Sequence, residues 1–309
     1  MNKVVAVLCS DIHIENCPSW RSAEADWFEA MARNLRELKQ VAQMHSVPVV
    51  CAGDIFTRWN ASPELVNFAI DNLPVTYSVR GNHDLPNHRH EEFRKSAYCT
   101  LVEAGMLVDL TDIRRIPASR LVLVPFPWGK PVVPLTQEIK KNFPENSIFL
   151  AVVHQYIWKE GSGYTGAPEE QKVKAFQKSL KGYHASVWGD NHKGFIINIP
   201  GTHALMNCGT VFRRHADEIN YCPHVGLLHE DGMISPYYLD ISKDVHVQDE
   251  HVSTIRDETD TMFTLQQLKS LSQDSLDFKL AVRRTVQGLR LRDACDESVE
   301  RLVLSAIED

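Results

Sequence analysis

Five short segments of this chain carry metal-binding residue types where an apolar run ends. They are Asp11-Ile12-His13, Gly53-Asp54, Gly81-Asn82-His83-Asp84, His154-Gln155 and Gly189-Asp190-Asn191-His192. The carboxyl ends of parallel strands meet in one crevice of an α/β sheet, so residues far apart in sequence can converge there. We therefore expect the five segments to form one site.

The donor types in these segments indicate the class of metal ion. Carboxylate and amide oxygens together with imidazole nitrogens suit Mn²⁺, Fe or Zn²⁺ better than Ca²⁺ or a thiolate-bound metal. Two such ions about 3.5–4 Å apart can activate a hydroxide and stabilise an in-line displacement at phosphorus. The sequence therefore predicts phosphate ester hydrolysis at a dinuclear centre. The Asp, Asn and His side chains of the five segments supply the candidate ligands.

Alternating strands and amphipathic helices are expected to position these residues. Apolar runs predict strands at 4–8, 47–51, 75–79, 107–110, 120–124, 148–153, 185–188, 194–199, 204–207, 224–229 and 234–239. Apolar spacings of three and four predict helices around 28–42, from 63 onward, at 93–104 and at 168–182. Strands alternating with helices in the first half indicate βαβ architecture, to which later strands are added.

The pattern changes near residue 244, which divides the chain into a core, 1–243, and an acidic region, 244–309, expected to be helical. Thr264-x-x-Gln267 is a possible capping box there. The region holds 8 Lys and Arg against 14 Asp and Glu, so it carries −6 of the chain's net charge of −7. The near-neutral core is therefore not prevented by charge from binding a nucleic acid. Amphipathic helices of this kind could dock a partner or form a homodimer.

Taken in order, the five segments resemble the calcineurin-like metallophosphoesterase superfamily, whose pattern is D-x-H, G-D, G-N-H-[DE], H and G-H-x-H. The match spans residues 11–192. The resemblance implies an α/β fold with a β-sandwich flanked by helices, followed here by a small helical C-terminal region. It implies that one ion is held by Asp11, His13, Asp54 and His192, and the other by Asp54, Asn82, His154 and Asp190, with Asp54 bridging.

The same resemblance implies a catalytic pair at Gly81-Asn82-His83-Asp84. His83 would protonate or stabilise the leaving oxygen, and Asp84 would orient the imidazole of His83. One position departs from the family pattern, since Asp190 stands where the first histidine of G-H-x-H belongs. A carboxylate there can bind the second ion directly or through water, and its charge favours a hard ion such as Mn²⁺.

The Gly-Asn-His-Asp segment resembles that of double-strand-break repair nucleases of the SbcD type and their phage relatives, rather than the G-N-H-E of protein phosphatases. This resemblance implies a manganese-dependent DNA exonuclease or endonuclease acting in DNA repair, recombination or degradation. It also implies a partner, an SbcC-type ABC ATPase with a coiled coil. Two alternatives stay open, namely hydrolysis of a small phosphodiester or phosphomonoester at the same centre, and a binding subunit without catalysis.

The remaining sequence features indicate the cellular environment that we expect for the protein. No apolar run approaches the roughly 18 residues of a membrane span. The 7 cysteines are scattered without a C-x-x-C pair, which argues against a disulfide framework and favours a reducing cytoplasm. Aromatic residues near the five segments could stack on an unpaired base, although core packing is their ordinary role. They are Phe56, Trp59, Phe126, Trp128, Tyr156 and Trp158.

Overall fold

A computed structural model describes residues 2–164, 166–199 and 201–247 of the chain. The compact unit that contains the five segments ends at His246. The helices expected within 248–309, with their capping box, lie outside the described residues. Among the described residues, no helix is long and apolar enough to span a membrane.

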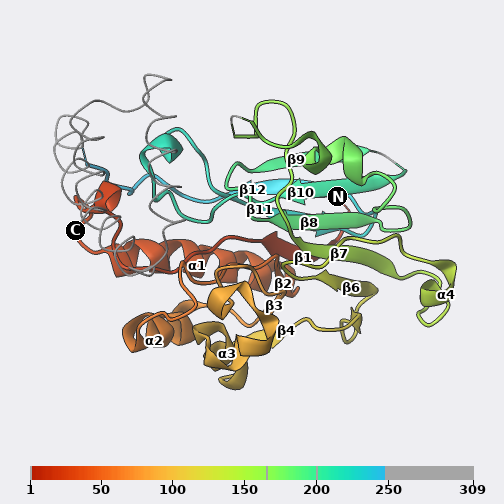
Figure 1. Ribbon diagram of the computed structural model, residues 1–309, viewed down its shortest axis with the longest axis horizontal. Coiled ribbons are helices and arrows are strands. Elements are labelled where there is room, and N and C mark those ends of the chain that lie inside the picture. Colours follow the sequence, from red (N-terminus) through yellow and green to blue (C-terminus); the bar gives the residue numbers. More distant parts are fainter. Residues whose placement is uncertain (1, 165, 200, 248–309) are drawn as a thin grey trace, which may run out of the picture. The chain divides into compact units, whose positions relative to one another are not determined.

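Two six-stranded mixed sheets form the centre of this unit (Figure 1). The first sheet has the order β12-β11-β1-β2-β3-β4 and the second the order β5-β6-β7-β8-β10-β9. The strands of the first are β1 Val4–Cys9, β2 Val49–Cys51, β3 Thr76–Ser78, β4 Leu107–Asp109, β11 His224–His229 and β12 Ile234–Tyr238. Those of the second are β5 Arg114–Arg115, β6 Leu121–Phe126, β7 Ile148–His154, β8 Ala185–Gly189, β9 Phe195–Ile199 and β10 His203–Asn207.

Parallel pairing brings the carboxyl ends of the site-bearing strands to one edge. β1 is parallel to β2 and β2 to β3, with Cys9 opposite Cys51 and Cys51 opposite Ser78. In the second sheet β7 is parallel to β8, with His154 opposite Gly189. The predicted mixed α/β fold with a β-sandwich is confirmed.

Side chains of the strands alternate between the space between the sheets and their outer faces. In β1, Val7 and Cys9 face a core shared with the helices, whereas Leu8 faces the core between the two sheets. A third core lies on the outer face of the second sheet, where Phe176 and Leu180 cover the strands. Three buried layers thus hold the strand ends that carry the site.

Helices α1 (Trp27–His45), α2 (Pro63–Asn72) and α3 (Ala97–Glu103) lie together along the first sheet (Figure 1). Asp26 begins α1 by accepting a hydrogen bond from the Glu29 backbone N–H, and Ser62 begins α2 with Pro63 in its first turn, as predicted. The short helix α4 and the 3₁₀ helices complete the unit: α4 Gln137–Lys140, η1 Ser19–Arg21, η2 Pro86–His88, η3 His90–Lys95, η4 Glu169–Gln171, η5 Val173–Phe176 and η6 Ala216–Glu218.

Two of the predicted helices differ from the structure. The helix expected at 93–104 begins only at Ala97, because the Ser96 side chain caps it and Phe93 lies in the preceding 3₁₀ turn. The helix expected at 168–182 is absent, and only short 3₁₀ turns form there. Its backbone bonds elsewhere, since Trp158 N–H donates to the Gln171 carbonyl and Val173 N–H donates to the Trp158 carbonyl.

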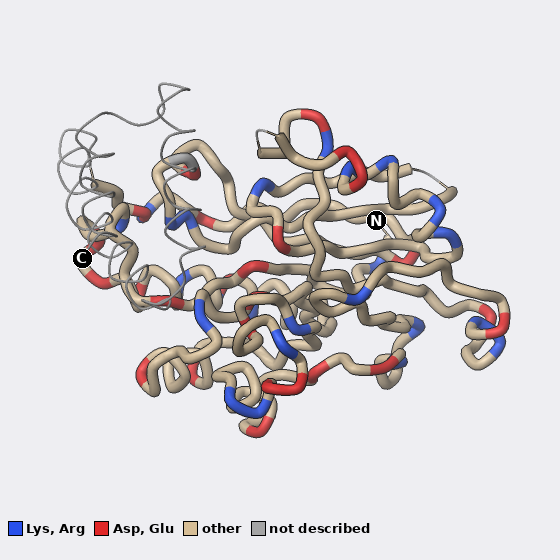
Figure 2. Tube along the Cα trace, viewed as in Figure 1, with Lys and Arg blue, Asp and Glu red and all other residues tan. Residues whose placement is uncertain are grey.

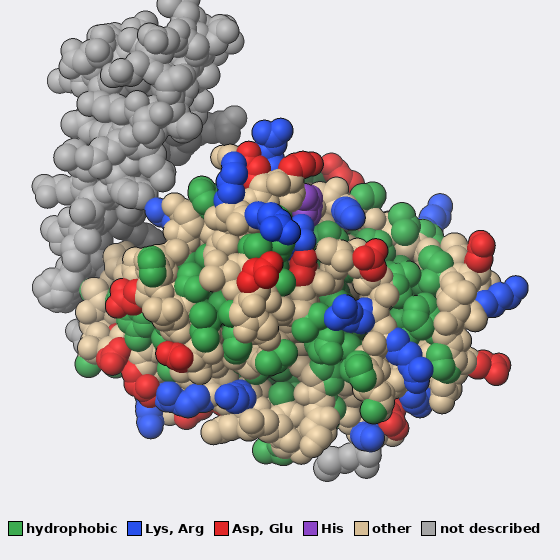
Figure 3. Space-filling view, turned by 90° about the horizontal axis from the view of Figure 1, so that it is seen from below, with side chains coloured by type: hydrophobic (Ala, Val, Ile, Leu, Met, Phe, Trp, Pro, Cys, Tyr) green, Lys and Arg blue, Asp and Glu red, His purple; other side chains and the backbone are tan. Residues whose placement is uncertain are grey.

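Charged residues lie mainly in the loops and helices around the sheets (Figure 2). Basic and acidic side chains alternate over the face drawn in Figure 3, and several Lys and Arg side chains surround an exposed histidine there. The described unit therefore carries mixed local charge, as the near-neutral sum for 1–243 predicts.

Candidate metal centre

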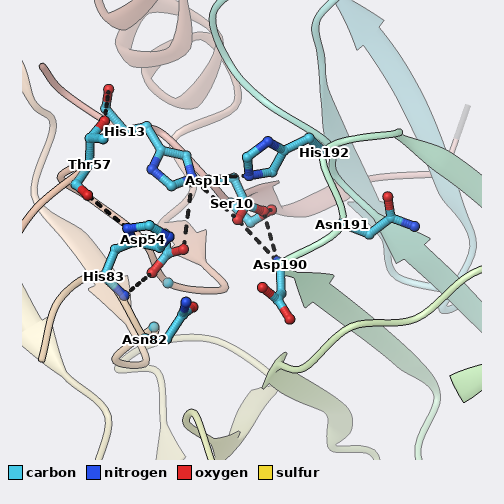
Figure 4. A network of polar contacts seen from close by, with 12 residues as sticks. Ser10, Asp11, His13, Asp54, Thr57, Asn82, His83, Asp190, Asn191 and His192 are labelled. Carbon is cyan, nitrogen blue, oxygen red and sulfur yellow. Dashed lines mark hydrogen bonds and ion pairs between the residues drawn. The ribbon is translucent and has the colours of Figure 1, made fainter. Parts of the chain in front are cut away.

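Each of the five segments begins where a strand ends. The fold brings four of them together in Figure 4, and His154 of the fifth lies beside Asp54 and Asn82. Asp11 and His13 follow β1, Asp54 follows β2, Asn82 and His83 follow β3, His154 is the last residue of β7, and Asp190 and His192 follow β8. Asp11, His13, Asp54 and His154 are buried. Side chains separated by as many as 181 positions in the chain thus share one location.

Several residues at these strand ends have a strained backbone conformation. Asp11, His13, Asp54 and Asp190 all have positive φ, between 48° and 81°. A non-glycine residue adopts this left-handed region at an energetic cost of about 1–3 kcal/mol, and such residues cluster at functional sites. Gly53 (φ +99°) precedes Asp54, and a Cβ there would lie 2.9 Å from the Gly81 nitrogen.

The first group of potential ligands consists of Asp11, His13 and His192, whose ligand atoms all lie within 4.8 Å of one another. His13 Nε2 lies 3.2 Å from His192 Nε2 and 3.8 Å from Asp11 Oδ1. The two imidazole rings meet edge to face with 5.0 Å between centroids. This group contains the residues predicted for the first ion, apart from Asp54.

The second group consists of Asp11, Asp54 and His154, again within 4.8 Å. His154 Nε2 lies 3.5 Å from Asp54 Oδ2 and 2.9 Å from the amide oxygen of Asn82. Asp54 Oδ2 also lies 3.7 Å from His13 Nε2, so this carboxylate stands between the two groups. Asp11 belongs to both groups as well, which the resemblance did not imply.

Hydrogen bonds fix the tautomer of His154. Its Nδ1 lies 2.6 Å from the Ala52 carbonyl oxygen. A carbonyl only accepts, so Nδ1 carries a hydrogen and Nε2 is the atom turned to the site, the usual arrangement of a metal-binding histidine. Nε2 faces the Asn82 amide oxygen, and it meets that acceptor with a proton when the ring is charged or with a bound cation when the ring is neutral. The donor set therefore fits a divalent ion that replaces this proton.

The pKa shifts of the second group also indicate that positive charge stabilises this site. Burial raises the pKa of Asp11 to about 7, opposed by the charge of His154. Burial alone would lower the pKa of His154, but the neighbouring Asp54 and Asp11 carboxylates hold it well above its usual value. Burial alone would also raise the pKa of Asp54, but the charge of His154 keeps that pKa below its ordinary value. This buried cluster is stable when cations compensate the carboxylates.

The histidines of the first group are held neutral. Burial, and next the charge of Arg214, keep the pKa of His13 well below its usual value and lower that of His192 to about 4. Neutral imidazole is the form that binds a metal ion. Both rings are therefore ready to act as ligands at neutral pH.

His83 and Asp84 have different partners from those expected. The Nδ1 of His83 lies 2.7 Å from the Thr57 carbonyl oxygen, and its backbone N–H donates to Asp54 Oδ1. Asp84 is fully buried, and its carboxylate accepts hydrogen bonds from the backbone N–H groups of Asp54, Ile55 and Gly81, at 2.8–3.0 Å. The prediction that Asp84 orients His83 is therefore wrong. Asp84 instead ties two site loops together, and the Thr57 carbonyl orients His83.

Asp190 lies beside the two groups rather than within either of them. Its backbone N–H donates to both oxygens of Asp11, at 3.0 and 3.2 Å. In Figure 4 its carboxylate points into the open space that Asn82 also faces. Burial raises the pKa of Asp190, so this acid also lies where a cation would stabilise its charge.

Three further side chains contribute to the centre, of which the sequence analysis named only Trp128, as an aromatic residue near the segments. Arg214 is buried, and its guanidinium lies 2.7 Å from Glu15 Oε1. The Ser10 hydroxyl donates to Asp11, and Trp128 places its ring edge-on against His154, 6.3 Å between centroids. Ser10 directly precedes the first segment and could have been suspected from its position. Nothing in the sequence placed Arg214 beside His13 and His192.

The comparisons with known proteins decide the family. The sequence description of the calcineurin-like phosphoesterases matches residues 5–194, more than half of the chain. This chain is a calcineurin-like phosphoesterase. Members of this family carry a dinuclear metal centre, and the Asp and His groups described above lie inside the matched range.

The solved structures that the chain is similar to are distant in sequence. One is a dimetal phosphatase from Danio rerio (11% identity, covering 78% of this chain and 100% of that chain, TM-score 0.45). An archaeal phosphodiesterase shows 12% identity, covering 76% and 99%, with a TM-score of 0.36. A phosphopantetheinyl hydrolase from Mycobacterium tuberculosis shows 14% identity, covering 72% and 99%, with a TM-score of 0.38. No curated protein matches the chain significantly.

Proposed function

We propose that this calcineurin-like phosphoesterase is a manganese-dependent DNA nuclease. The observation that carries the proposal is the pair of buried ligand groups that share Asp11, with Asp54 between them and His83 at their edge. Such a pair can hold two ions, which supply when bound an activated water and charge stabilisation at phosphorus. His13 and His192 would hold one ion, and His154 and Asn82 the other.

His83 is the residue that handles the leaving group's proton. Because the Thr57 carbonyl holds Nδ1–H, Nε2 is the atom left to donate or accept a proton. The ring lies edge to face with His13, 5.1 Å between centroids, and so stands next to the first ligand group. General acid catalysis of this kind contributes about 10²- to 10⁴-fold to a rate.

Aromatic and basic side chains around the centre favour DNA as the substrate. The Trp128 ring packs on His154 on one side and lies 6.2 Å from the exposed His88 ring. Tyr156 and Tyr164 line a cavity beside the centre together with the exposed Lys193. Ring faces that stack on bases and cations that hold phosphates are what a nucleic-acid strand requires. The hard carboxylate of Asp190 favours Mn²⁺ over softer ions.

The test is cleavage of linear DNA, single-stranded and duplex, by the purified full chain with Mn²⁺, beside a small ester, bis-(p-nitrophenyl) phosphate. We expect DNA to be cleaved with the higher kcat/KM. The His83→Ala variant should lose about 10²- to 10⁴-fold on DNA and less on the nitrophenyl ester, whose leaving group needs no proton. Turnover of the small ester without cleavage of DNA would refute the DNA assignment and leave a small-molecule phosphodiesterase. No turnover of either substrate by metal-loaded protein would favour a binding subunit.

The partner assignment stays a prediction. Residues 244–309, which hold most of the acidity, are proposed to dock an ABC ATPase with a coiled coil or to form a homodimer. If they serve only a partner, deleting 248–309 should leave hydrolysis of the small ester unchanged. Measurement of kcat/KM and of mass in solution for both forms checks this.

A further inference from the structure

A cavity of about 340 Å³ opens beside the metal centre. Its lining includes Asp190 and His192, which also belong to the candidate centre, and the aromatic side chains Tyr156, Tyr164 and Tyr221. Because the cavity and the centre share these residues, a group attached to a phosphorus at the centre can extend into it. The volume is at the lower end of the range for ligand pockets, about 300–1,000 Å³.

Neighbouring contacts hold the three tyrosines in place at the cavity. Tyr164 backbone N–H donates to the Tyr156 hydroxyl at 3.2 Å, and the two rings meet edge to face at 5.2 Å between centroids. The Tyr221 hydroxyl donates to the Cys208 carbonyl at 3.1 Å, and its half-buried ring lies 6.2 Å from the His224 ring. Tyr164 is 54% exposed, so this side chain offers the most open surface to a ligand.

The charges around the cavity suit an anionic ligand. Lys193 and His215 are exposed at the cavity, on the two segments that enclose it. The lining has two acidic members. Asp190 lies at the metal centre, where a cation would offset its charge, and Glu218 is turned to the protein, since its carboxylate accepts a hydrogen bond from the His215 backbone N–H at 3.0 Å. An aromatic ring system that bears a phosphate therefore matches the lining better than an aliphatic or acidic group.

We propose that this cavity binds one unpaired nucleobase next to the scissile phosphate, so that the centre acts on single-stranded or frayed DNA in preference to intact duplex. This inference rests on the proposed nuclease function and specifies its substrate. A base in a duplex has both faces covered by its neighbours and must leave the stack to enter a pocket of this kind. Tyr164, Tyr156 and Tyr221 supply the stacking surface, and Lys193 holds the adjoining phosphate.

The test is a cycle of two changes, one in the protein and one in the substrate. The full chain is given Mn²⁺ and either a single-stranded oligonucleotide or the same oligonucleotide with an abasic nucleotide beside the bond to be cleaved. The KM and kcat of the two substrates are then compared. Base stacking on an aromatic ring is worth about 1–3 kcal/mol, so we expect removal of the base to raise KM about 5- to 140-fold in the wild type. In Tyr164→Ala and Tyr156→Ala the two substrates should become nearly equal.

Two control variants separate stacking from loss of structure. Tyr164→Phe keeps the ring and should keep the preference for the natural base. Tyr238→Ala removes a tyrosine that is similarly exposed, 62%, but lines no part of the cavity, and should also keep it. An equal loss on both substrates in Tyr164→Ala, or an unchanged preference in that variant, would overturn the base pocket while leaving the nuclease intact. Absence of any DNA cleavage would instead refute the nuclease assignment.

Discussion

Gly81 is the position at which one methyl group should dismantle the proposed centre. A Cβ built there would lie 2.7 Å from both the backbone nitrogen and Cγ of Asp54, and closer still to Oδ1. Ordinary Cβ contacts begin at 3.4 Å. The variant Gly81→Ala must therefore push the Asp54 carboxylate away by about 0.7 Å or more, and the backbone contact prevents relief by side-chain rotation alone.

A displacement of this size exceeds what a metal site tolerates. Ligand distances vary by about 0.2 Å in working sites, and a misplacement near 1 Å lowers a rate about 10²-fold. Because Asp54 lies between the two ligand groups, both ions should bind more weakly. We expect Gly81→Ala to lose at least one Mn²⁺ per chain and about 10²-fold or more in kcat/KM, while overpacking lowers stability by about 1–3 kcal/mol.

Metal analysis, phosphodiester hydrolysis and thermal unfolding are measured together on this variant. Gly226→Ala is the matched control, since its Cβ would collide with Met206 in the core between the sheets, away from the centre. That variant should lose stability to a similar extent but retain both ions and activity. Gly81→Ala with two ions and wild-type turnover would refute the placement of Asp54 between the two ions.

Three further variants test other residues of the centre. His83→Ala should lower kcat about 10²- to 10⁴-fold with metal content unchanged, and loss of an ion by plasma mass spectrometry would count against a proton-transfer role. Asp190→His should fold normally and shift the metal preference from Mn²⁺ toward softer ions, whereas an identical activity profile across metals would show that Asp190 does not contact an ion. For pH, the pKa of Asp11 is raised from 3.8 to about 7, so its contribution to stability is present at low pH and lost as pH rises through 7. In metal-free protein Asp11 alone should lower the free energy of unfolding by at most about 4 kcal/mol between pH 3.8 and 7, and Asp84, whose pKa burial also raises to about 7, adds to the fall. Asp11→Asn or added Mn²⁺ should therefore reduce the slope of the profile in urea titrations without removing it, and a slope unaffected by either would contradict the assignment.

The sequence predicted the parts of this fold that follow from local patterning. Strand ends are visible where an apolar run stops at a polar residue, and parallel pairing then requires that those ends meet. Asp11, Asp54 and His154 could be placed together on that reasoning alone. Capping residues such as Ser62 are also local signals, so the start of helix α2 could be predicted from the sequence.

The errors arose where a long-range contact overrides a local pattern. The spacing of Phe176 and Leu180 is that of an α-helix. The backbone of this segment instead forms hydrogen bonds with Trp158, and both side chains are buried on the second sheet although no α-helix forms there. Asp84 follows His83 directly, which suggested a pair, yet its carboxylate accepts from the backbone N–H groups of Asp54 and Ile55 in another loop and of Gly81 in its own. Contacts between segments distant in sequence leave no periodic signal.

The dinuclear mechanism predicts that activity depends on the second ion. Metal-free protein is titrated with Mn²⁺ while bound metal and cleavage of a single-stranded oligonucleotide are followed in the same samples. We predict that two ions bind per chain and that cleavage rises with occupancy of the second. Full activity with one ion bound, or none with two, would contradict the account.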